Sequence, residues 1–163
     1  MRIEAQSGGV ARQSGGVARQ GGTDQVVMIG IGRETFALEA SFVREISDPI
    51  PVTRVAGARP HLSSVINVRG NVVPLADIRQ RFGMADTADT ADTRFVVIEI
   101  AIDGDPVTVG LVADRVHEVT EITRADAQQI PRIGTSWRPE YIRSIVKWRD
   151  EFVIIPELEA ILH

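Results

Sequence analysis

The feature that most constrains the fold is a pair of apolar runs separated by an Asp-Gly-Asp turn. RFVVIEIAI occupies residues 94–102 and PVTVGLVA residues 106–113, with the turn at 103–105. Asp-Gly between alternating apolar runs is a strong short-range signal of a β-hairpin. The β-branched and aromatic residues in these runs favour strands over helices. This segment therefore predicts two long antiparallel strands.

Shorter runs of the same kind recur along the chain from Gln25 onward, separated by Gly, Asp and Pro residues that are typical of turns. The expected strands lie at residues 26–31, 35–40, 43–46, 53–56, 64–68, 71–76, 115–122, 141–148 and 151–155. Only two short helices are expected, one at 77–83 with capping residues at both ends and one that opens at Pro156. Many short strands with few helices indicate an all-β protein, and two small β-barrels in tandem are the economical arrangement. We expect the connection between the barrels near residues 84–93.

The N-terminal stretch differs from the rest because it repeats itself. Residues 6–12 and 13–19 both read QSGGVAR, and each copy offers only Val and Ala as apolar side chains. So little apolar surface cannot offset the entropy lost when a chain becomes ordered. We therefore expect residues 1–24 to form a disordered, Gly-rich tail and residues 25–163 to form the folded domain. A second repeat, ADTADTADT at 85–93, is expected to be a polar insert, called the ADT insert below.

Composition narrows the class of protein. The chain of 163 residues is 44% apolar, which is enough for one hydrophobic core without disulfides or a structural metal. It has no cysteine, which excludes cysteine nucleophiles and is compatible with a reducing cytoplasm. A net charge of −4 speaks against nucleic-acid binding, which requires clustered Lys and Arg. No apolar run approaches the roughly 20 residues that cross a bilayer, so we expect a cytoplasmic protein without direct membrane insertion.

The residues that could carry chemistry do not form a catalytic or metal-binding pattern. The three histidines, at 61, 117 and 163, have no spacing that would bring two imidazoles to one metal ion. Ser63 and Ser64 lie near the first histidine but lack the GxSxG turn of a serine hydrolase. The aspartates of the ADT insert lack the central Gly and closing Glu of a calcium loop. We therefore expect no catalytic residue, no metal ion and no cofactor.

The most informative stretch is SSVINVRGNVVPLADIRQRFG, at residues 63–83. Arg69 stands at a turn between two apolar strands, where its guanidinium group can pair with a carboxylate. We expect Asn67 and Gly70 to build the turn, Gly70 because it tolerates a positive φ. This stretch resembles the signature of CheW-like domains, in which Val-Ile-Asn-Leu-Arg-Gly leads into a strand, a proline and an Asp-Leu-Arg helix. Residues 65–70 match that signature with one conservative change.

The resemblance extends from about Gln25 to the C-terminus. Residues 36–46 look like the family's second strand and its Val-x-Glu-Ile element, and residues 107–122 look like its Gly-Leu-x-Val-Asp-x-Val segment. Residues 145–162 are similar to the family's closing strands and helix. The resemblance implies a fold of two five-stranded, SH3-like β-barrels with short helices, including one at the C-terminus.

The resemblance also implies a function without catalysis. CheW-like proteins are adaptors that bridge the cytoplasmic tip of a chemoreceptor and the regulatory domain of the histidine kinase CheA, itself a CheW homologue. Contact with other CheW-like domains in receptor arrays is a further expectation. In the family, apolar residues between the two barrels take up the receptor helix. Glu45 matches the family's Val-x-Glu-Ile glutamate and Arg69 the arginine of its central motif, so we expect both to couple receptor and kinase.

Four apolar residues are expected to accompany this pair in the partner interface, namely Val43, Ile46, Val65 and Ile66. Each of them can equally belong to the core, and for Val65 and Ile66 the core is the favoured interpretation. Glu45 and Arg69 can also pair with each other across the first barrel, in which case the effects of replacing them should not add.

Two other functions remain open at this point. A CheW-like adaptor of a non-flagellar pathway, such as twitching motility or developmental signalling, would carry the same sequence signature. A small β-barrel enzyme or ligand-binding protein predicts instead a concave pocket with converging polar groups. We expect a separate adaptor rather than the end of a longer kinase, because no helical segment bearing a histidine precedes residue 25.

Overall fold

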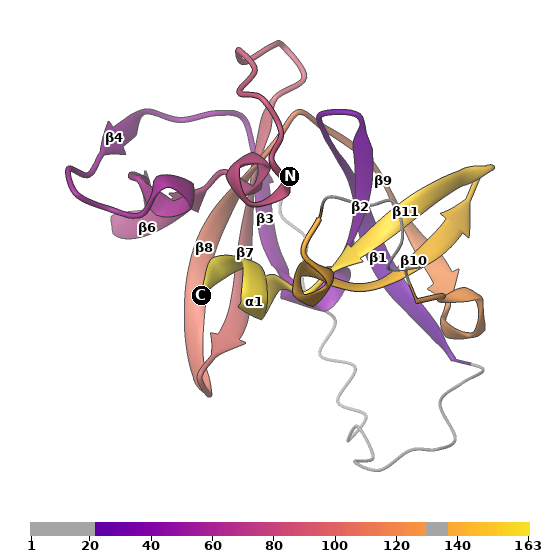
Figure 1. The fold of residues 1–163 in the computed structure, drawn as a ribbon. Helices are drawn as coiled ribbons and strands as arrows, with labels where there is room; N and C mark the ends of the chain where they lie inside the picture. Colours follow the sequence, from indigo (N-terminus) through magenta and orange to yellow (C-terminus); the bar gives the residue numbers. More distant parts are fainter. Residues whose placement is uncertain (1–21, 130–136) are drawn as a thin grey trace.

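The protein, described here by a computed structural model that covers residues 22–129 and 137–163, is built mainly of β-strands in two sheets (Figure 1). The first sheet has the order β10 (Ile142–Trp148), β11 (Glu151–Pro156), β2 (Glu34–Glu39), β1 (Thr23–Ile31) and β9 (Arg115–Thr123). The second sheet has the order β3 (Val43–Ser47), β7 (Arg94–Ile102), β8 (Asp105–Ala113), β6 (Asn71–Ala76), β5 (Ser64–Val68) and β4 (Val52–Arg54). The expected all-β class is confirmed.

Short helices connect the strands. Within the described residues there is one α-helix, α1 (Leu158–Leu162), and the 3-10 turns are η2 (Ala40–Phe42), η3 (Pro60–Leu62), η4 (Ile78–Phe82), η5 (Arg124–Asp126) and η6 (Pro139–Tyr141). The helix expected at 77–83 is η4, and the Asp77 carboxylate caps it by accepting a hydrogen bond of 3.1 Å from the Arg79 amide. The terminal helix begins at Leu158 rather than at Pro156, because Pro156 pairs with Ile142 in the first sheet.

The chain does not complete one sheet before it starts the other. β1 and β2 belong to the first sheet, β3 to β8 form the second, and β9 to β11 return to the first. Residues 84–93 therefore connect η4 to β7 within the second sheet, which corrects the expectation that they join two halves of the chain. The chain passes between the sheets at η2 and again at Asp114, between β8 and β9.

The N-terminal boundary of the folded part lies two residues earlier than expected. Thr23 and Asp24, which we assigned to the tail, pair with Thr123 and Ile122 at the start of β1. Asp24 also forms an ion pair of 2.6 Å with Arg124. Residues 1–21, which hold the repeat, lie outside the described residues.

Two-residue turns connect three of the hairpins. Arg69 and Gly70, Asp103 and Gly104, and Arg149 and Asp150 all have positive φ values, between 49° and 86°. Positive φ at both central residues is the conformation that suits the right-handed twist of hairpin strands. The hairpin expected at the Asp-Gly turn is confirmed, with Ile102 opposite Asp105.

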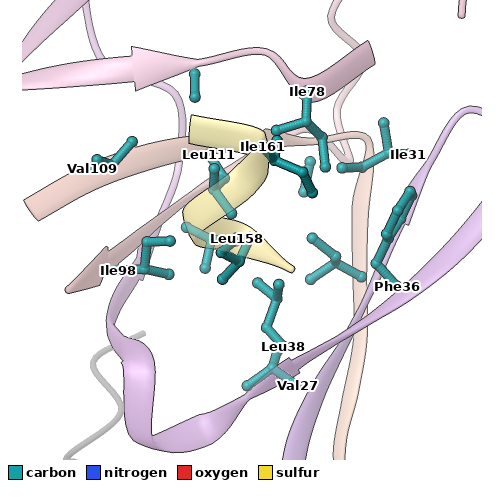
Figure 2. Close-up of a cluster of buried hydrophobic side chains, with 14 of the residues drawn as sticks. Val27, Ile31, Phe36, Leu38, Ile78, Ile98, Val109, Leu111, Leu158 and Ile161 are labelled. Atoms are coloured by element: carbon teal, nitrogen blue, oxygen red, sulfur yellow. The ribbon is translucent and has the colours of Figure 1, made fainter. Parts of the chain in front are cut away.

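Side chains from both sheets pack together in one hydrophobic cluster, and each sheet has a smaller cluster of its own. Figure 2 shows Leu158 and Ile161 of α1 between Phe36 and Leu38 of the first sheet and Ile98, Val109 and Leu111 of the second. These residues are all at most 4% exposed. Burying one such side chain contributes about 1.5–3 kcal/mol, so removing the contacts made by α1 would weaken both sheets together. The two sheets are thus halves of one packed unit.

A polar cluster also links the sheets, which we call the Arg79–Asp114 clamp. The Arg79 guanidinium is 3% exposed and donates to the carboxylates of Asp77 and Asp114. The other oxygen of Asp114 accepts a hydrogen bond of 2.6 Å from the Gly32 amide, in the β1–β2 turn of the first sheet. Because Arg79 belongs to η4, which follows β6 of the second sheet, this cluster fixes the position of the second sheet relative to the first.

Candidate protein-interaction site

A β-bulge in β3 sets the direction of the side chains at the candidate site. Val43 pairs with Ile98 and Glu45 with Val97, so Arg44 is an extra residue without an opposite partner on β7. A bulge of this kind turns one side chain to the other face and breaks the alternation of a regular strand. As a result Val43 and Ile46 are both buried, while Arg44 and Glu45 are both partly exposed. The bulge thus presents two adjacent charged side chains from one strand.

The second part of the site is the turn between β5 and β6. Gly70 has a φ of +85°, and its amide donates a hydrogen bond of 2.8 Å to the Asn67 side-chain oxygen. In the structure the Asn67 side chain thus binds the turn backbone, and Gly70 occupies a positive-φ position of the turn. Arg69 occupies the first position of the turn with a φ of +52°, so its side chain projects from a conformationally restricted loop.

Glu45 and Arg69 meet although they come from distant strands. The Arg69 guanidinium lies 3.1 Å from a Glu45 carboxylate oxygen, and the two side chains are 55% and 21% exposed. β3 is at one edge of the second sheet and β5 is next to the opposite edge, so the sheet must curve strongly to bring them together. The pairing foreseen from the sequence is confirmed. An ion pair this exposed contributes little to stability, about 0–1 kcal/mol.

The four apolar residues expected beside this pair have different positions. Val43 and Ile66 are 0% and 3% exposed and pack in separate core clusters. Both side chains therefore belong to the core, the alternative left open for Val43 and favoured for Ile66, because a side chain with so little accessible surface has few atoms to offer a partner. Val65 is partly exposed on β5, and Ile46 is buried but lines a groove.

That groove lies where the two sheets meet. Its volume is about 350 Å³, and it is lined by Ile46 and Arg94 of the second sheet and by residues 116–119 of β9 in the first. Val119, on the groove wall, is a large apolar side chain that is 39% exposed. Charged groups of both signs surround it, with Arg94 3.5 Å from Asp48. A groove lined partly by apolar side chains and partly by charges of both signs can take up an amphipathic helix.

The contacts of His61 are structural. It is buried, and burial, then the nearby charges of Arg81 and Arg59, lower its pKa. Its Nε2 lies 3.0 Å from an Arg81 nitrogen, and since arginine only donates, Nε2 is the acceptor. Arg81 also donates to the Tyr141 hydroxyl and to the Ile161 carbonyl, both at 3.0 Å. This histidine helps fasten α1 to the second sheet.

Residues 22–129 and 137–163 contain no group of three His, Cys, Asp or Glu side chains that could hold a metal ion. None of the helices in these ranges has the length and apolar character needed to cross a membrane.

Comparison with known proteins identifies the class of protein first. The fold resembles the crystal structure of the scaffolding protein TtCheW from Thermoanaerobacter tengcongensis, with a TM-score of 0.77 and 25% identity over 87% of this chain and 89% of that chain. The protein is therefore a mainly β-stranded domain with the fold class expected from the sequence.

The sequence then identifies the family. Residues 25–163 match the CheW-like domain family. The chemotaxis protein CheW of Helicobacter pylori is 33% identical over 132 residues, which are 81% of this chain and 77% of that protein. A probable chemotaxis protein CheW of Rhizobium etli is 28% identical over 140 residues, 86% of this chain and 88% of that protein. The chain belongs to the CheW-like domain family, a family of adaptors and scaffolds.

Three features of the site were not predicted. The bulge has a weak signal in the sequence, because the apolar residues Val43 and Ile46 are three apart where a regular strand would place them two or four apart. The groove depends on how the sheets pack and has no local signal. Asp114 lies in a segment that resembles the family, but its contact with Arg79 joins residues 35 positions apart.

Proposed function

We propose that the protein is a non-enzymatic adaptor that couples a chemoreceptor to a CheA-like histidine kinase in the cytoplasm. The observation that carries this proposal is the exposed ion pair of Glu45 and Arg69, at the two positions that match the family's coupling residues. Arg69 donates to Glu45 through one nitrogen and its side chain is 55% exposed, so a partner can reach further N–H donors of the guanidinium. A partner carboxylate or carbonyl can bind there without displacing Glu45.

We assign the kinase and the receptor to different surfaces. The Glu45–Arg69 surface suits the regulatory domain of the kinase because it presents charges that fix orientation, and β5, which leads into the Arg69 turn, also carries the partly exposed apolar side chain of Val65. The groove between the sheets suits one amphipathic helix of the receptor tip. Because the groove is lined by both sheets, a receptor that changes its packing there can alter the position of the second sheet and hence of the kinase surface.

The test of this assignment uses two exposed valines of similar accessibility. Val119 is 39% exposed in the groove, and Val55 is 43% exposed but does not line it. We expect Val119→Asp to weaken binding of a receptor-tip peptide about tenfold, because the complex would lose a buried apolar contact and desolvate a charge. Val55→Asp should leave this binding unchanged. Neither variant should change binding of the kinase regulatory domain. Equal loss of receptor binding in both variants, or none in either, would overturn the assignment.

The pathway itself is the second part of the proposal. We infer that the adaptor serves a chemotaxis array that controls motility. An adaptor of twitching motility or developmental signalling would differ from a chemotaxis adaptor in the receptor and the kinase that it joins. Pull-down with the full set of receptor tips and kinases from the same genome identifies the pair that binds. If the protein were instead an enzyme, it would turn over a substrate in the absence of any protein partner.

A further inference from the structure

The Arg79–Asp114 clamp lies between the two surfaces to which we assigned the receptor and the kinase. Asp114 is followed by β9, and residues 116–119 of β9 line the groove. In the other direction, β6 runs from the turn that carries Arg69 to Asp77, the cap of η4. A short segment of chain therefore leads from the clamp to the groove, and another leads from the clamp to the kinase surface.

The clamp is tied to the first sheet by several contacts of the backbone. The Asp114 amide donates a hydrogen bond of 2.8 Å to the Gly30 carbonyl, and the Asp114 carboxylate accepts one of 2.6 Å from the Gly32 amide. The next residue, Arg115, lies so close to Gly30 that a Cβ atom there would be 2.7 Å from the Arg115 Nε. Arg115 also donates to the Gly32 carbonyl at 3.2 Å. Asp114 therefore moves together with β1 and the β1–β2 turn.

The clamp is held less completely at its second-sheet end. The Arg79 side chain is 3% exposed and donates through its two terminal nitrogens, one to Asp77 at 3.2 Å and the other to Asp114. Its Nε is buried and has no hydrogen-bond partner among residues 22–129 and 137–163. A buried donor without a partner is uncommon and raises the energy of the arrangement that contains it. The guanidinium group can therefore change its position without losing a hydrogen bond at Nε.

The hydrophobic cluster between the sheets does not fix their relative position in the same way. Apolar contacts are non-directional, so packed elements can slide by small amounts and remain in contact. A guanidinium group between two carboxylates, in contrast, requires defined distances and angles. Of these two kinds of contact, the clamp is the one that defines where the second sheet lies relative to the groove wall on β9.

We propose that Arg79 and Asp114 are positioning residues that transmit a change in the groove to the kinase surface. A helix that fills the groove displaces β9, Asp114 follows because it adjoins β9, and Arg79 carries the displacement to β6 and the Arg69 turn. Neither member of the clamp lines the groove, and Arg79 is too deeply buried to contact a partner. This inference rests on the proposed adaptor function, to which it adds the residues that couple the two surfaces.

The experiment measures how much one partner changes the affinity for the other. We expect a saturating receptor-tip peptide to change the affinity of the wild-type protein for the kinase regulatory domain at least about fivefold in calorimetric titration. In Asp114→Asn this change should fall below about twofold, and the affinity for each partner alone should stay within about twofold of wild type. Val146→Ala is the matched control, because it leaves a cavity in the cluster inside the first sheet. It should lower the melting temperature and keep the full coupling.

A second variant and a measurement without partners complete the test. Arg79→Lys keeps the positive charge, but an ammonium group cannot replace the planar fork that reaches both carboxylates, so the coupling should again fall below about twofold. The chain has no cysteine, so spin labels can be attached through Val72→Cys on β6 and Glu121→Cys on β9, both exposed positions. The distance distribution between the labels, measured by double electron–electron resonance, should be shifted or broadened in Asp114→Asn and unchanged in Val146→Ala.

The outcomes separate this inference from the adaptor function. Wild-type protein that binds neither partner would refute the adaptor function together with the coupling. Full coupling in both clamp variants, no coupling in a wild-type protein that binds both partners, or an equal loss of coupling in Val146→Ala would overturn the inference and leave the adaptor function standing. An unchanged distance distribution in Asp114→Asn would overturn it whether or not a partner binds.

Discussion

Replacing Glu45 and Arg69, singly and together, separates a role in binding from a role in folding. The structure predicts a small effect on stability. The ion pair is 3.1 Å long but its side chains are 21% and 55% exposed, so we expect each alanine variant to lose no more than about 1 kcal/mol. For a domain of this size, 1 kcal/mol lowers the melting temperature by about 2–4 °C. The fold should therefore survive both substitutions.

The effect on binding should be larger. A kinase domain that covers this surface would remove both charges from water, and truncating one member of a buried, hydrogen-bonded charge pair costs about 2–5 kcal/mol. That range corresponds to a loss of affinity of at least about 30-fold. Because Glu45 and Arg69 act through one contact, the double variant should bind about as weakly as the weaker single variant.

Calorimetric titration with the kinase regulatory domain measures the binding, and circular dichroism melts measure the stability. A matched control is Arg124→Ala, which breaks an ion pair with Asp24 of comparable exposure, 35% and 29%, on the first sheet. The control should lower the melting temperature as much as Arg69→Ala and leave kinase affinity unchanged. Unchanged affinity in all Glu45 and Arg69 variants, with melting temperatures lower by more than about 4 °C, would show that the pair is structural and refute the assignment.

Four further outcomes follow from the structure. Asp114→Asn should lower the free energy of unfolding in urea by about 3 kcal/mol, the low end for a broken buried pair, since Arg79 keeps a second carboxylate. Gly70→Ala should cost about 1–2 kcal/mol in the same assay, because φ is +85°. The pKa of His61 is lowered in the folded state, so as the pH drops below about 6.5 the unfolded chain binds a proton at this histidine before the folded chain does. The melting temperature should therefore fall with pH in this range, and it should fall less steeply in His61→Gln. Deleting residues 2–21 should not change the melting temperature, because their repeats offer little apolar surface.

Each of these outcomes has a clear contrary result. Asp114→Asn with wild-type stability would mean that the clamp does not join the sheets. Gly70→Ala without loss would mean that the turn relaxes to another conformation. An identical dependence of melting temperature on pH in His61→Gln and wild type would assign the titration to other groups. A drop in melting temperature on deletion of residues 2–21 would mean that the repeats pack on the domain.

Most of the strands and turns could be predicted because their signals are local. The two apolar runs and the Asp-Gly pair within residues 94–113 predict a hairpin, and in the structure β7 and β8 are joined at that pair. The turn at Arg69 and Gly70 and the cap at Asp77 are likewise decided by two or three neighbouring residues. Local preference and tertiary structure agree at these positions.

The arrangement of the sheets could not be predicted from local signals. The connection was expected at residues 84–93 because that polar repeat looks like a linker, yet the chain changes sheets at η2 and at Asp114. Which strands pair is determined by the shared core, in which β1 and β2 are completed by strands from the end of the chain. Such contacts join residues more than 80 positions apart, such as Gly32 and Asp114, and leave no trace in a short window.

The candidate site lies where regular patterns are broken, and that explains why it was only partly predictable. A regular strand at β3 would point Arg44 and Ile46 to the same face, and either the core would lose an isoleucine or it would bury an arginine. The bulge avoids this conflict by leaving Arg44 without a register partner on β7, so that Ile46 remains in the core and Glu45 faces Arg69. The turn adds a non-glycine residue with positive φ at Arg69, which a hairpin tolerates only at its tip. Two irregularities at nearly opposite edges of one sheet thus produce one charged pair, and such departures from local rules are typical of functional positions.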